Sequence, residues 1–375
     1  MSGSHTVAAI DCGTNSIRLL IASADSDGRL VEQARELEMV RLGQGVDATG
    51  SFRPDALERT FSACRTFAQA IADHHCDRVR FVATSAARDV SNRDAFFAGV
   101  RQALGVDAEV IDGMEEASLS FAGAISGIQV IDEPVLVIDC GGGSTELVLG
   151  RGSSIDSRVS LNIGSVRLRE RFLHDDPPTV EQIDDARKYV REALDSCPVD
   201  VAAARTVIGV AGTVTSLSAI GQNLTDYDRA KVHRSVLTVG QISDLAGKLL
   251  SSTVDEVEQM GPLKRRRAEV LCGGAVIIDE VCRRATAGKL VVSETDILDG
   301  MALAMLAQGS RSAPGPRSPT GRGRRLKPVP VRVRIPSGVH SFTRSSYAVC
   351  TTSVVASVKS SFRGTGKVSC RRCVV

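Results

Sequence analysis

The sequence is poor in aromatic residues and lacks any long apolar run. It contains no tryptophan, and aromatic residues make up only 3% of its 375 positions. No stretch approaches the ~18 consecutive apolar residues of a membrane-spanning helix, which excludes such a helix. The N-terminus shows no basic segment followed by an apolar one, so we expect a cytoplasmic protein. At ~150 residues per domain, the length predicts two or three domains.

Cysteine pairs with metal-binding spacing are also scarce. Seven of the ten cysteines lie scattered before residue 310, and none of these seven forms a C-x-x-C pair. Cys370 and Cys373 have that spacing, but no second ligand pair accompanies them. A chain of this size needs no disulfides to fold. We therefore predict reduced thiols rather than a disulfide framework, a zinc site or a redox site.

Acidic residues are absent from the last part of the chain. Residues 310–375 contain 14 Lys or Arg and no Asp or Glu, so the remainder carries 32 basic and 44 acidic side chains, a net charge of −12. A segment rich in Pro, Gly, Ser and Arg cannot easily bury a core, and we predict that this tail is mostly disordered. The tail could bind polyanions weakly through its charge. The alternative is an appendage without function, such as a change of reading frame produces.

What the sequence does contain is a repeated unit. An apolar strand, a turn with an Asp, glycine and hydroxyl residues, and a second apolar strand occur at residues 7–22 and again at residues 135–149. The repeat predicts an α/β protein in which two related domains face each other across a cleft. We place these domains at residues 1–127 and 128–309, with the last helix of the second domain able to pack back on the first.

Helical and strand patterns alternate after each unit. Apolar residues at three- and four-residue spacing indicate helices, and short apolar runs indicate strands. Helices are expected at 54–74, 93–104, 115–125, 213–220, 268–284 and 296–307, and further strands at 79–83, 108–111, 206–210 and 290–292.

The turn of the second unit has the composition of a phosphate-binding loop. Its three consecutive glycines let the backbone approach a ligand closely and turn several N–H groups to one side. Together with two hydroxyls, these donors suit phosphate oxygens; they belong to Gly141, Gly142, Gly143, Ser144 and Thr145. Asp139 ends the preceding strand and could hold Mg²⁺ directly or through water. The alternative is an ordinary glycine-rich hairpin.

The turn of the first unit offers the same ingredients. Asp11 ends the strand, and the glycine, hydroxyl and amide groups that follow belong to Gly13, Thr14, Asn15 and Ser16. Two such turns, one in each domain, fit a clamp around a chain of phosphates.

Two further segments are candidate anion contacts. Gly212 and Thr213 lie where a strand runs into a helix, and a helix N-terminus presents free N–H groups to an anion. Arg88 follows a strand at its carboxyl end, where open α/β sheets bind ligands. A simple helix start and a surface salt bridge are the respective alternatives.

Hydrolysis also requires a group that orients or deprotonates water. Glu115 and Glu116 open a helix, and Glu146 closes the second glycine turn. A carboxylate in reach of the attacking water typically contributes ~10²–10⁴-fold. Acidic residues in a first helical turn are also ordinary partners of the helix dipole, and the pattern alone favours that role.

The motifs taken together resemble those of the exopolyphosphatase and guanosine pentaphosphate phosphohydrolase (Ppx/GppA) family, within the sugar kinase, heat-shock and actin superfamily. The resemblance covers about residues 6–308. It rests on the order of the blocks 11–16, 83–89, 113–117, 139–146, 209–213 and 232–233. The family implies two ribonuclease-H-like domains and Mg²⁺-dependent removal of a terminal phosphate from polyphosphate or guanosine pentaphosphate.

The resemblance also implies residue roles. The catalytic base of the family falls on Glu116, and its metal-associated acids fall on Asp139 and Glu146, with Asp11 a third metal candidate from the repeat. Its phosphate contacts fall on Asn15, Ser16, Arg88, Gly142, Gly143, Ser144 and Thr145. The chain departs from the family in three places. Longer members carry additional basic helical domains, an arginine usual before Gly300 is absent, and Arg234 replaces a common glycine.

The expected activity is hydrolysis of the terminal phosphate of short or medium polyphosphate chains. Guanosine pentaphosphate 5′-phosphohydrolase activity is the nearest alternative. A polyphosphate-dependent phosphotransferase and a non-hydrolytic sensor of alarmone or polyphosphate are two further hypotheses. A homodimer is possible in such a family, although the sequence identifies no interface.

Overall fold

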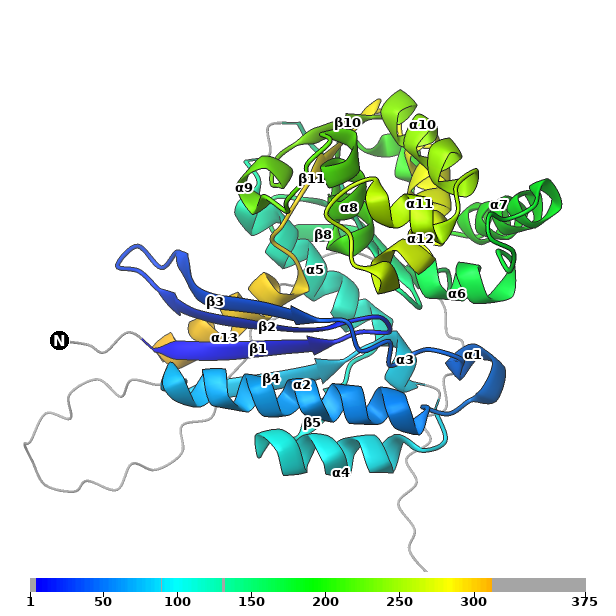
Figure 1. Cartoon of the computed structure of the whole chain (residues 1–375). Helices are drawn as coiled ribbons and strands as arrows, with labels where there is room; N and C mark the ends of the chain where they lie inside the picture. Colours follow the sequence, from blue (N-terminus) through cyan, green and yellow to red (C-terminus); the bar gives the residue numbers. More distant parts are fainter. Residues whose placement is uncertain (1–4, 89, 130–131, 312–375) are drawn as a thin grey trace, which may run out of the picture. The chain divides into compact units, whose positions relative to one another are not determined.

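Two β-sheets with helices on their faces form the part of the chain that the computed structural model describes, residues 5–88, 90–129 and 132–311 (Figure 1). This arrangement confirms the predicted α/β class. The basic tail from residue 312 onward, with Cys370 and Cys373, lies outside the described residues. The last described helix, which ends at Arg311, includes the first two residues of the tail predicted from residue 310.

The first sheet has the strand order β3-β2-β1-β4-β5. Its strands are β1 (Thr6–Cys12), β2 (Ile17–Ala24), β3 (Leu30–Glu38), β4 (Arg78–Ala83) and β5 (Ala108–Val110). The first three pair antiparallel, whereas β4 and β5 run parallel to β1. Sequence patterns missed β3, because this edge strand is exposed along most of its length and carries charged residues.

The second sheet repeats this topology in the order β10-β11-β9-β6-β7-β8. Its strands are β6 (Val135–Cys140), β7 (Thr145–Arg151), β8 (Ser154–Leu161), β9 (Thr206–Val210), β10 (Val236–Thr238) and β11 (Lys289–Val292). Again three strands form an antiparallel meander, and β9 and β11 continue parallel to β6. The repeat in the sequence is therefore a repeat of hairpin and sheet.

Each face of the first sheet is covered by helices. The alternation of β1 sends Ala8 and Ile10 into a core with α2 (Pro54–Asp73) and α4 (Arg93–Leu104), and Val7 and Ala9 into a core with α13 (Ile297–Arg311). Two short helices, α1 (Val46–Thr49) and α3 (Ser85–Arg88), complete this half. In Figure 1, α2 and α4 lie below the sheet and α13 lies behind it.

The second sheet is covered in the same way. Val135 and Val137 of β6 pack with Phe121 of α5 (Gly113–Gly127), whereas Leu136 and Ile138 face a larger helical core. That core includes α6 (Ser165–Arg171), α7 (Val180–Asp195), α8 (Ala211–Gly221), α10 (Val239–Leu250), α11 (Val254–Gln259) and α12 (Arg265–Cys282). The short helix α9 (Arg229–Val232) and a 3₁₀ turn at Val201–Ala203 complete the half.

Helices α5 and α13 exchange places between the two sheets. Helix α5 follows the first sheet in sequence but contributes Phe121 to the core of the second, and α13 follows the second sheet but packs on β1 and β2. The two helices cross closely. A Cβ atom at Gly123 would lie 1.7 Å from the backbone oxygen of Asp296, and one at Gly300 would lie 2.1 Å from the backbone oxygen of Leu119. This crossing joins the two halves and needs glycine on both helices.

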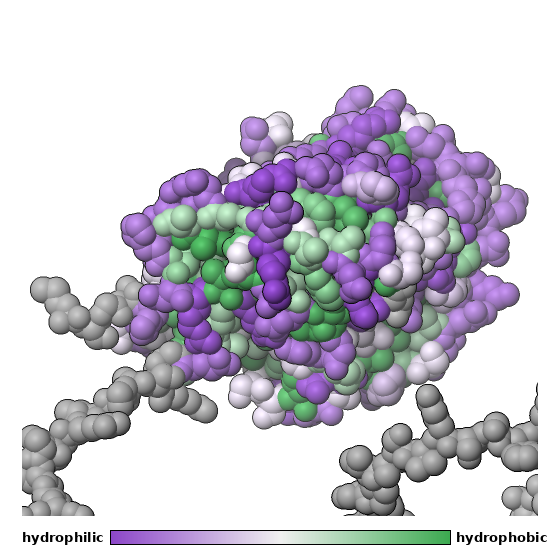
Figure 2. Space-filling model, turned by 90° about the horizontal axis from the view of Figure 1, so that it is seen from below, coloured by the Kyte–Doolittle hydropathy of each residue, from purple (hydrophilic) through white to green (hydrophobic). Residues whose placement is uncertain are grey.

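The surface seen from below in the orientation of Figure 1 is mixed. Figure 2 shows hydrophobic areas on this face interrupted by hydrophilic residues. Within the described part of the chain, no helix combines the length and the apolar character that a membrane crossing demands.

Replacing Gly123 by alanine tests the helix crossing. The new methyl group would meet backbone atoms that cannot rotate away, and overpacking of this kind costs about 1–3 kcal/mol or more. We expect a matching loss in the free energy of unfolding, measured with urea. Gly247→Ala on α10 is the control, because no atom of the described residues outside its own helix lies within 4 Å of a Cβ there, and alanine favours a helix. Equal stability of Gly123→Ala and the wild type would contradict the described crossing.

Candidate active site

Equivalent turns connect β1 to β2 and β6 to β7. The amide of Gly13 donates to the carbonyl of Ser16 at 2.9 Å, and the amide of Gly141 donates to the carbonyl of Ser144 at 3.0 Å. The strand register places Asp11 opposite Arg18 in the first hairpin and Asp139 opposite Glu146 in the second. The two hairpins thus share this backbone hydrogen bond, but the residue opposite the aspartate is an arginine in the first and a glutamate in the second.

The two turns lie directly against each other. A Cβ atom at Gly142 would lie 2.9 Å from the Cβ of Thr14, and one at Gly143 would lie 2.7 Å from both the Thr14 and Ser85 hydroxyl oxygens. A side chain at either glycine would separate the turns. Glycine is needed here for this close approach, because any larger residue would separate the backbone amides of one half from the other.

A cavity of about 560 Å³ opens beside the turns. Twelve of the predicted site residues line it: Asp11, Gly13, Thr14, Asn15, Ser16, Glu116, Asp139, Gly141, Gly142, Gly143, Ser144 and Gly212. Residues from both sheets, from α5 and from the start of α8 therefore converge on one space.

Four predicted residues lie behind the cavity wall. The hydroxyl of Thr145 donates to the carbonyl of Ile163 at 2.7 Å, and that of Thr213 lies 3.5 Å from the carbonyl of Cys140. Both threonines are buried, so their hydroxyl groups serve the backbone rather than a ligand. Arg88 forms an ion pair with Glu116, and Glu146 accepts a hydrogen bond from Ser160 at 2.6 Å. Arg88 thus positions Glu116 instead of lining the cavity.

Four carboxyl groups are buried at the site: Asp11, Glu116 and Asp139 line the cavity, and Glu146 lies opposite Asp139 behind the wall. Burial raises the pKa of Asp139 to about 6. Burial and the neighbouring Asp139 raise the pKa of Glu146 to about 8. Burial, followed by repulsion from Glu146, raises the pKa of Glu116 well above its usual value. The site disfavours full ionisation of these groups, and a bound cation would relieve this cost.

The carboxyl groups fit Mg²⁺ without forming a complete cage. Among the described residues, no three His, Cys, Asp or Glu side chains group together as a ready metal site. Mg²⁺ needs no such cage, because it commonly takes one or two carboxylates and completes its shell with water and substrate phosphates. Asp139 lines the cavity and lies opposite Glu146 in the strand register. Ser120 donates a hydrogen bond to one carboxylate oxygen of Asp139. Asp11 fits less well, because Arg18 already pairs with it.

Two residues that line the cavity, Thr14 and Asn15, carry buried polar groups with unmet hydrogen-bonding capacity in the described part of the chain. Among the residues that the structure describes, the buried hydroxyl of Thr14 and both buried side-chain polar atoms of Asn15 have no hydrogen-bond partner. Such groups are costly to bury, and a ligand with oxygen atoms would satisfy them. Arg267 of α12 lies so close to Gly212 that a Cβ atom there would sit 2.2 Å from its guanidinium. Burial, followed by repulsion from Arg18, lowers the pKa of Arg267 to about 10.

Sequence patterns did not identify the cationic residues of the cavity. Arg18, Arg35, Arg229, Lys264 and Arg267 all line it. Arg18 forms ion pairs with both Asp11 and Asp296. Of these five residues, only Arg18 could have been found from the sequence, because it occupies in the first hairpin the position that Glu146 occupies in the second. The others lie in charged segments that resemble exposed surface.

Comparisons with known protein families, sequences and structures all point to related phosphatases. The sequence pattern of the Ppx/GppA phosphatase family matches residues 20–308. The chain is 48% identical over 313 residues to Exopolyphosphatase 2 of Mycobacterium tuberculosis, which covers 80% of this chain and 98% of that protein. This chain resembles the crystal structure of an exopolyphosphatase-like protein, with 42% identity and a TM-score of 0.78. The match covers 82% of this chain and 99% of the other. This chain also resembles the crystal structure of the Ppx/GppA family member of Aquifex aeolicus, with 31% identity and a TM-score of 0.69. That match covers 82% of this chain and 99% of the other.

The raised pKa of Glu146 predicts that its charge destabilises the metal-free protein. Above pH 4.5 an unfolded chain loses this proton, whereas the folded protein keeps it until about pH 8, so stability falls as the pH rises between these values. In a metal-free buffer, we expect Glu146→Gln to raise the free energy of unfolding at pH 8 by more than about 1 kcal/mol. The gain should disappear near pH 4.5.

Urea unfolding at the two pH values measures this difference. Glu58→Gln, on the exposed surface of α2, is the matched control for loss of one charge. An equal effect of Glu146→Gln at both pH values would contradict the assigned ionisation.

Proposed function

Because this chain belongs to the Ppx/GppA phosphatase family, we propose that it is an exopolyphosphatase, a phosphoanhydride hydrolase that releases orthophosphate from the end of inorganic polyphosphate. The observation that carries this proposal is the contact between two glycine turns from two sheets beside one cavity. Adjacent phosphates of a chain can be held by both turns at once. The 48% identical relative bears the name of this activity.

Binding of the phosphate chain rests on backbone and neutral polar groups. The amides of the two turns and the hydroxyls of Ser16 and Ser144 would surround the terminal phosphates, and Asn15 would gain the partners it lacks. The start of α8 at Gly212 adds further amide donors, and Arg267 adds a positive charge. Many donors of this kind stabilise the charge on the transferring phosphoryl group.

Glu116 is the group that we assign to water activation. It is buried at the start of α5, it lines the cavity, and Arg88 fixes its carboxylate. Its raised pKa makes the carboxylate a better proton acceptor than an exposed glutamate. It would take a proton from the water that attacks the terminal phosphorus. The phosphoanhydride bond then breaks, and the bridging oxygen leaves with the shortened chain.

Asp139 and Glu146 are the groups that would hold Mg²⁺. When bound, the metal would neutralise phosphate charge during the transfer. Ser120 and Ser160 donate hydrogen bonds to these two carboxyl groups and fix their orientation.

We further place the protein in the cytoplasm. All seven cysteines in the described part of the chain are free, which is typical of a reducing compartment. Homodimer formation stays a prediction.

Phosphate release from several substrates tests the proposal. The purified chain is assayed with tripolyphosphate, longer polyphosphate and guanosine pentaphosphate, each with and without Mg²⁺. We expect release from polyphosphate that requires Mg²⁺. Tyr227, which is 47% exposed as a residue and lines the cavity, is the observation that favours including a nucleotide. Release only from guanosine pentaphosphate, ATP formation when ADP is added, or binding without turnover would each overturn the exopolyphosphatase assignment.

Replacing Glu116 by glutamine tests the catalytic base. We expect kcat for polyphosphate to fall by about 10²–10⁴-fold, because glutamine cannot accept the proton. Binding of polyphosphate should stay close to that of the wild type, as measured by titration calorimetry. Near-normal turnover would remove Glu116 from this role.

Replacing Asp139 by asparagine tests the metal site. We expect Mg²⁺ affinity, measured by the Mg²⁺-dependent rise in melting temperature, to fall at least about tenfold. Asp156→Asn, at an exposed position of β8, is the matched control. Unchanged stabilisation by Mg²⁺ in Asp139→Asn would show that the metal binds elsewhere.

A further inference from the structure

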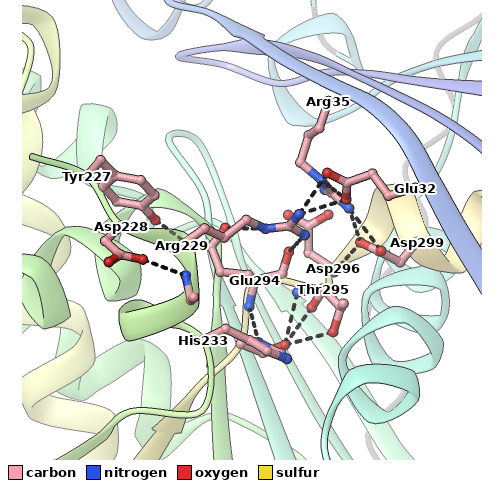
Figure 3. Close-up of polar contacts among 12 residues, drawn as sticks. Glu32, Arg35, Tyr227, Asp228, Arg229, His233, Glu294, Thr295, Asp296 and Asp299 are labelled. Atoms are coloured by element: carbon pink, nitrogen blue, oxygen red, sulfur yellow. Dashed lines mark hydrogen bonds and ion pairs between the residues drawn. The ribbon is translucent and has the colours of Figure 1, made fainter.

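An ion pair between the two halves of the protein lines one side of the cavity. Arg229, the first residue of α9, donates from one nitrogen to both carboxylate oxygens of Glu32 on β3, at 2.8 and 2.7 Å (Figure 3). The guanidinium of Arg35 donates to the same carboxylate at 2.9 Å. All three residues line the cavity. Glu32 therefore lies between two arginines, one from each half.

Each arginine is anchored by a second carboxylate. Arg35 donates to both oxygens of Asp299, at 2.9 and 3.0 Å. Arg229 lies 3.3 Å from a carboxylate oxygen of Glu294, and Tyr227 donates to the other oxygen of that group. Figure 3 shows these side chains pointing toward one another across the space between β3 and α9. Each arginine of this wall therefore has an acidic partner besides Glu32.

The wall that α12 contributes has the opposite character. Lys264 and Arg267 line the cavity there, and neither takes part in an ion pair within the described residues. Positive charge on that wall is free for an anion, whereas the positive charge of Arg35 and Arg229 is neutralised. A polyphosphate chain would meet unpaired cations on one wall and the carboxylate of Glu32 on the other.

We propose that Glu32 sets the length of polyphosphate that the cavity accepts, by occupying with its own carboxylate the place that an inner phosphate would take on Arg229 and Arg35. This inference rests on the exopolyphosphatase function proposed above. A short chain held at the glycine turns leaves the pair intact. A longer chain running toward β3 and α9 must break the pair and approach a negative charge.

The pair has the properties of a closure that a substrate can open. The side chains of Glu32 and Arg229 are 34% and 37% exposed, and ion pairs of that exposure are weak. Phosphate oxygens form the same forked contacts with a guanidinium as a carboxylate does. Loss of the Glu32 charge would leave two anchored arginines ready for an inner phosphate. The residue thus disfavours long chains without contacting the reacting phosphate.

Glu32→Gln tests the proposal in the full chain. We compare kcat/KM for two substrates: tripolyphosphate, as the short chain, and a polyphosphate of several hundred units, as the long chain. For the long chain, we expect kcat/KM to rise about tenfold, the effect of one 1.4 kcal/mol interaction. The change should lie in KM, because inner phosphates are remote from the bond that breaks. Tripolyphosphate cleavage should change less than about twofold on the same scale.

Two further variants distinguish the proposed effect of Glu32 on chain length from other effects of the substitution. Arg229→Gln also breaks the pair but removes the cation, so it should give a smaller gain for long chains than Glu32→Gln. Glu58→Gln removes one surface charge from the first half of α2, at a residue that does not line the cavity, and should leave the length profile unchanged. An equal change for all chain lengths in Glu32→Gln, or no change in any, would overturn the proposal.

Binding measurements distinguish failure of this inference from failure of the proposed function. If the wild type releases no phosphate from any chain, the exopolyphosphatase function fails. The proposed effect of Glu32 is still tested by the affinity for the long chain, which titration calorimetry measures in Glu116→Gln with and without Glu32→Gln. Identical affinities in the two proteins would reject a role for Glu32.

Discussion

The close approach of two glycine turns is the constraint on which the site depends. Backbone amides from two separate sheets can share one ligand only where no side chain stands between them. Gly142 and Gly143 meet that condition, because a Cβ atom at either would touch Thr14. The approach is fixed from both sides: Arg167 of α6 donates to the carbonyl of Gly143 at 2.9 Å, and the amide of Gly43 donates to the carbonyl of Thr14 at 2.8 Å.

A duplicated hairpin has taken on two different tasks in the two halves. In the second hairpin, Asp139 faces Glu146, and their repulsion together with burial creates a demand for a cation. In the first hairpin Arg18 stands where Glu146 would be, and it neutralises Asp11. In the function proposed above, the carboxyl groups that would hold Mg²⁺ therefore belong to the second half, and the first half contributes groups that bind phosphate. The exchange of α5 and α13 fits this division, because α5 carries Glu116 from the first half to the second sheet.

The sequence predicted those parts of the site that are encoded locally. Strand, glycine turn and strand form a continuous pattern, so both hairpins and the residues of their turns were found. Edge strand β3 was missed, because its exposed charged residues lack the apolar alternation of a buried strand. The hydroxyls of Thr145 and Thr213 lie in the right segments, but the direction of a side chain depends on packing that a linear pattern does not contain.

Pairs between distant segments explain why the charge of the site could not be predicted. Glu32 and Arg229 are 197 residues apart in sequence, and Arg35 and Asp299 are 264 apart. A net charge of −12 before residue 310 argues against attraction of a polyanion. The cavity does not follow this average, because most of its acids are already committed to arginines while Lys264 and Arg267 have no such partner in the described chain. What a phosphate chain meets is the charge left over after pairing. That remainder differs from wall to wall, so a single acid placed between two arginines can restrict the length of a substrate.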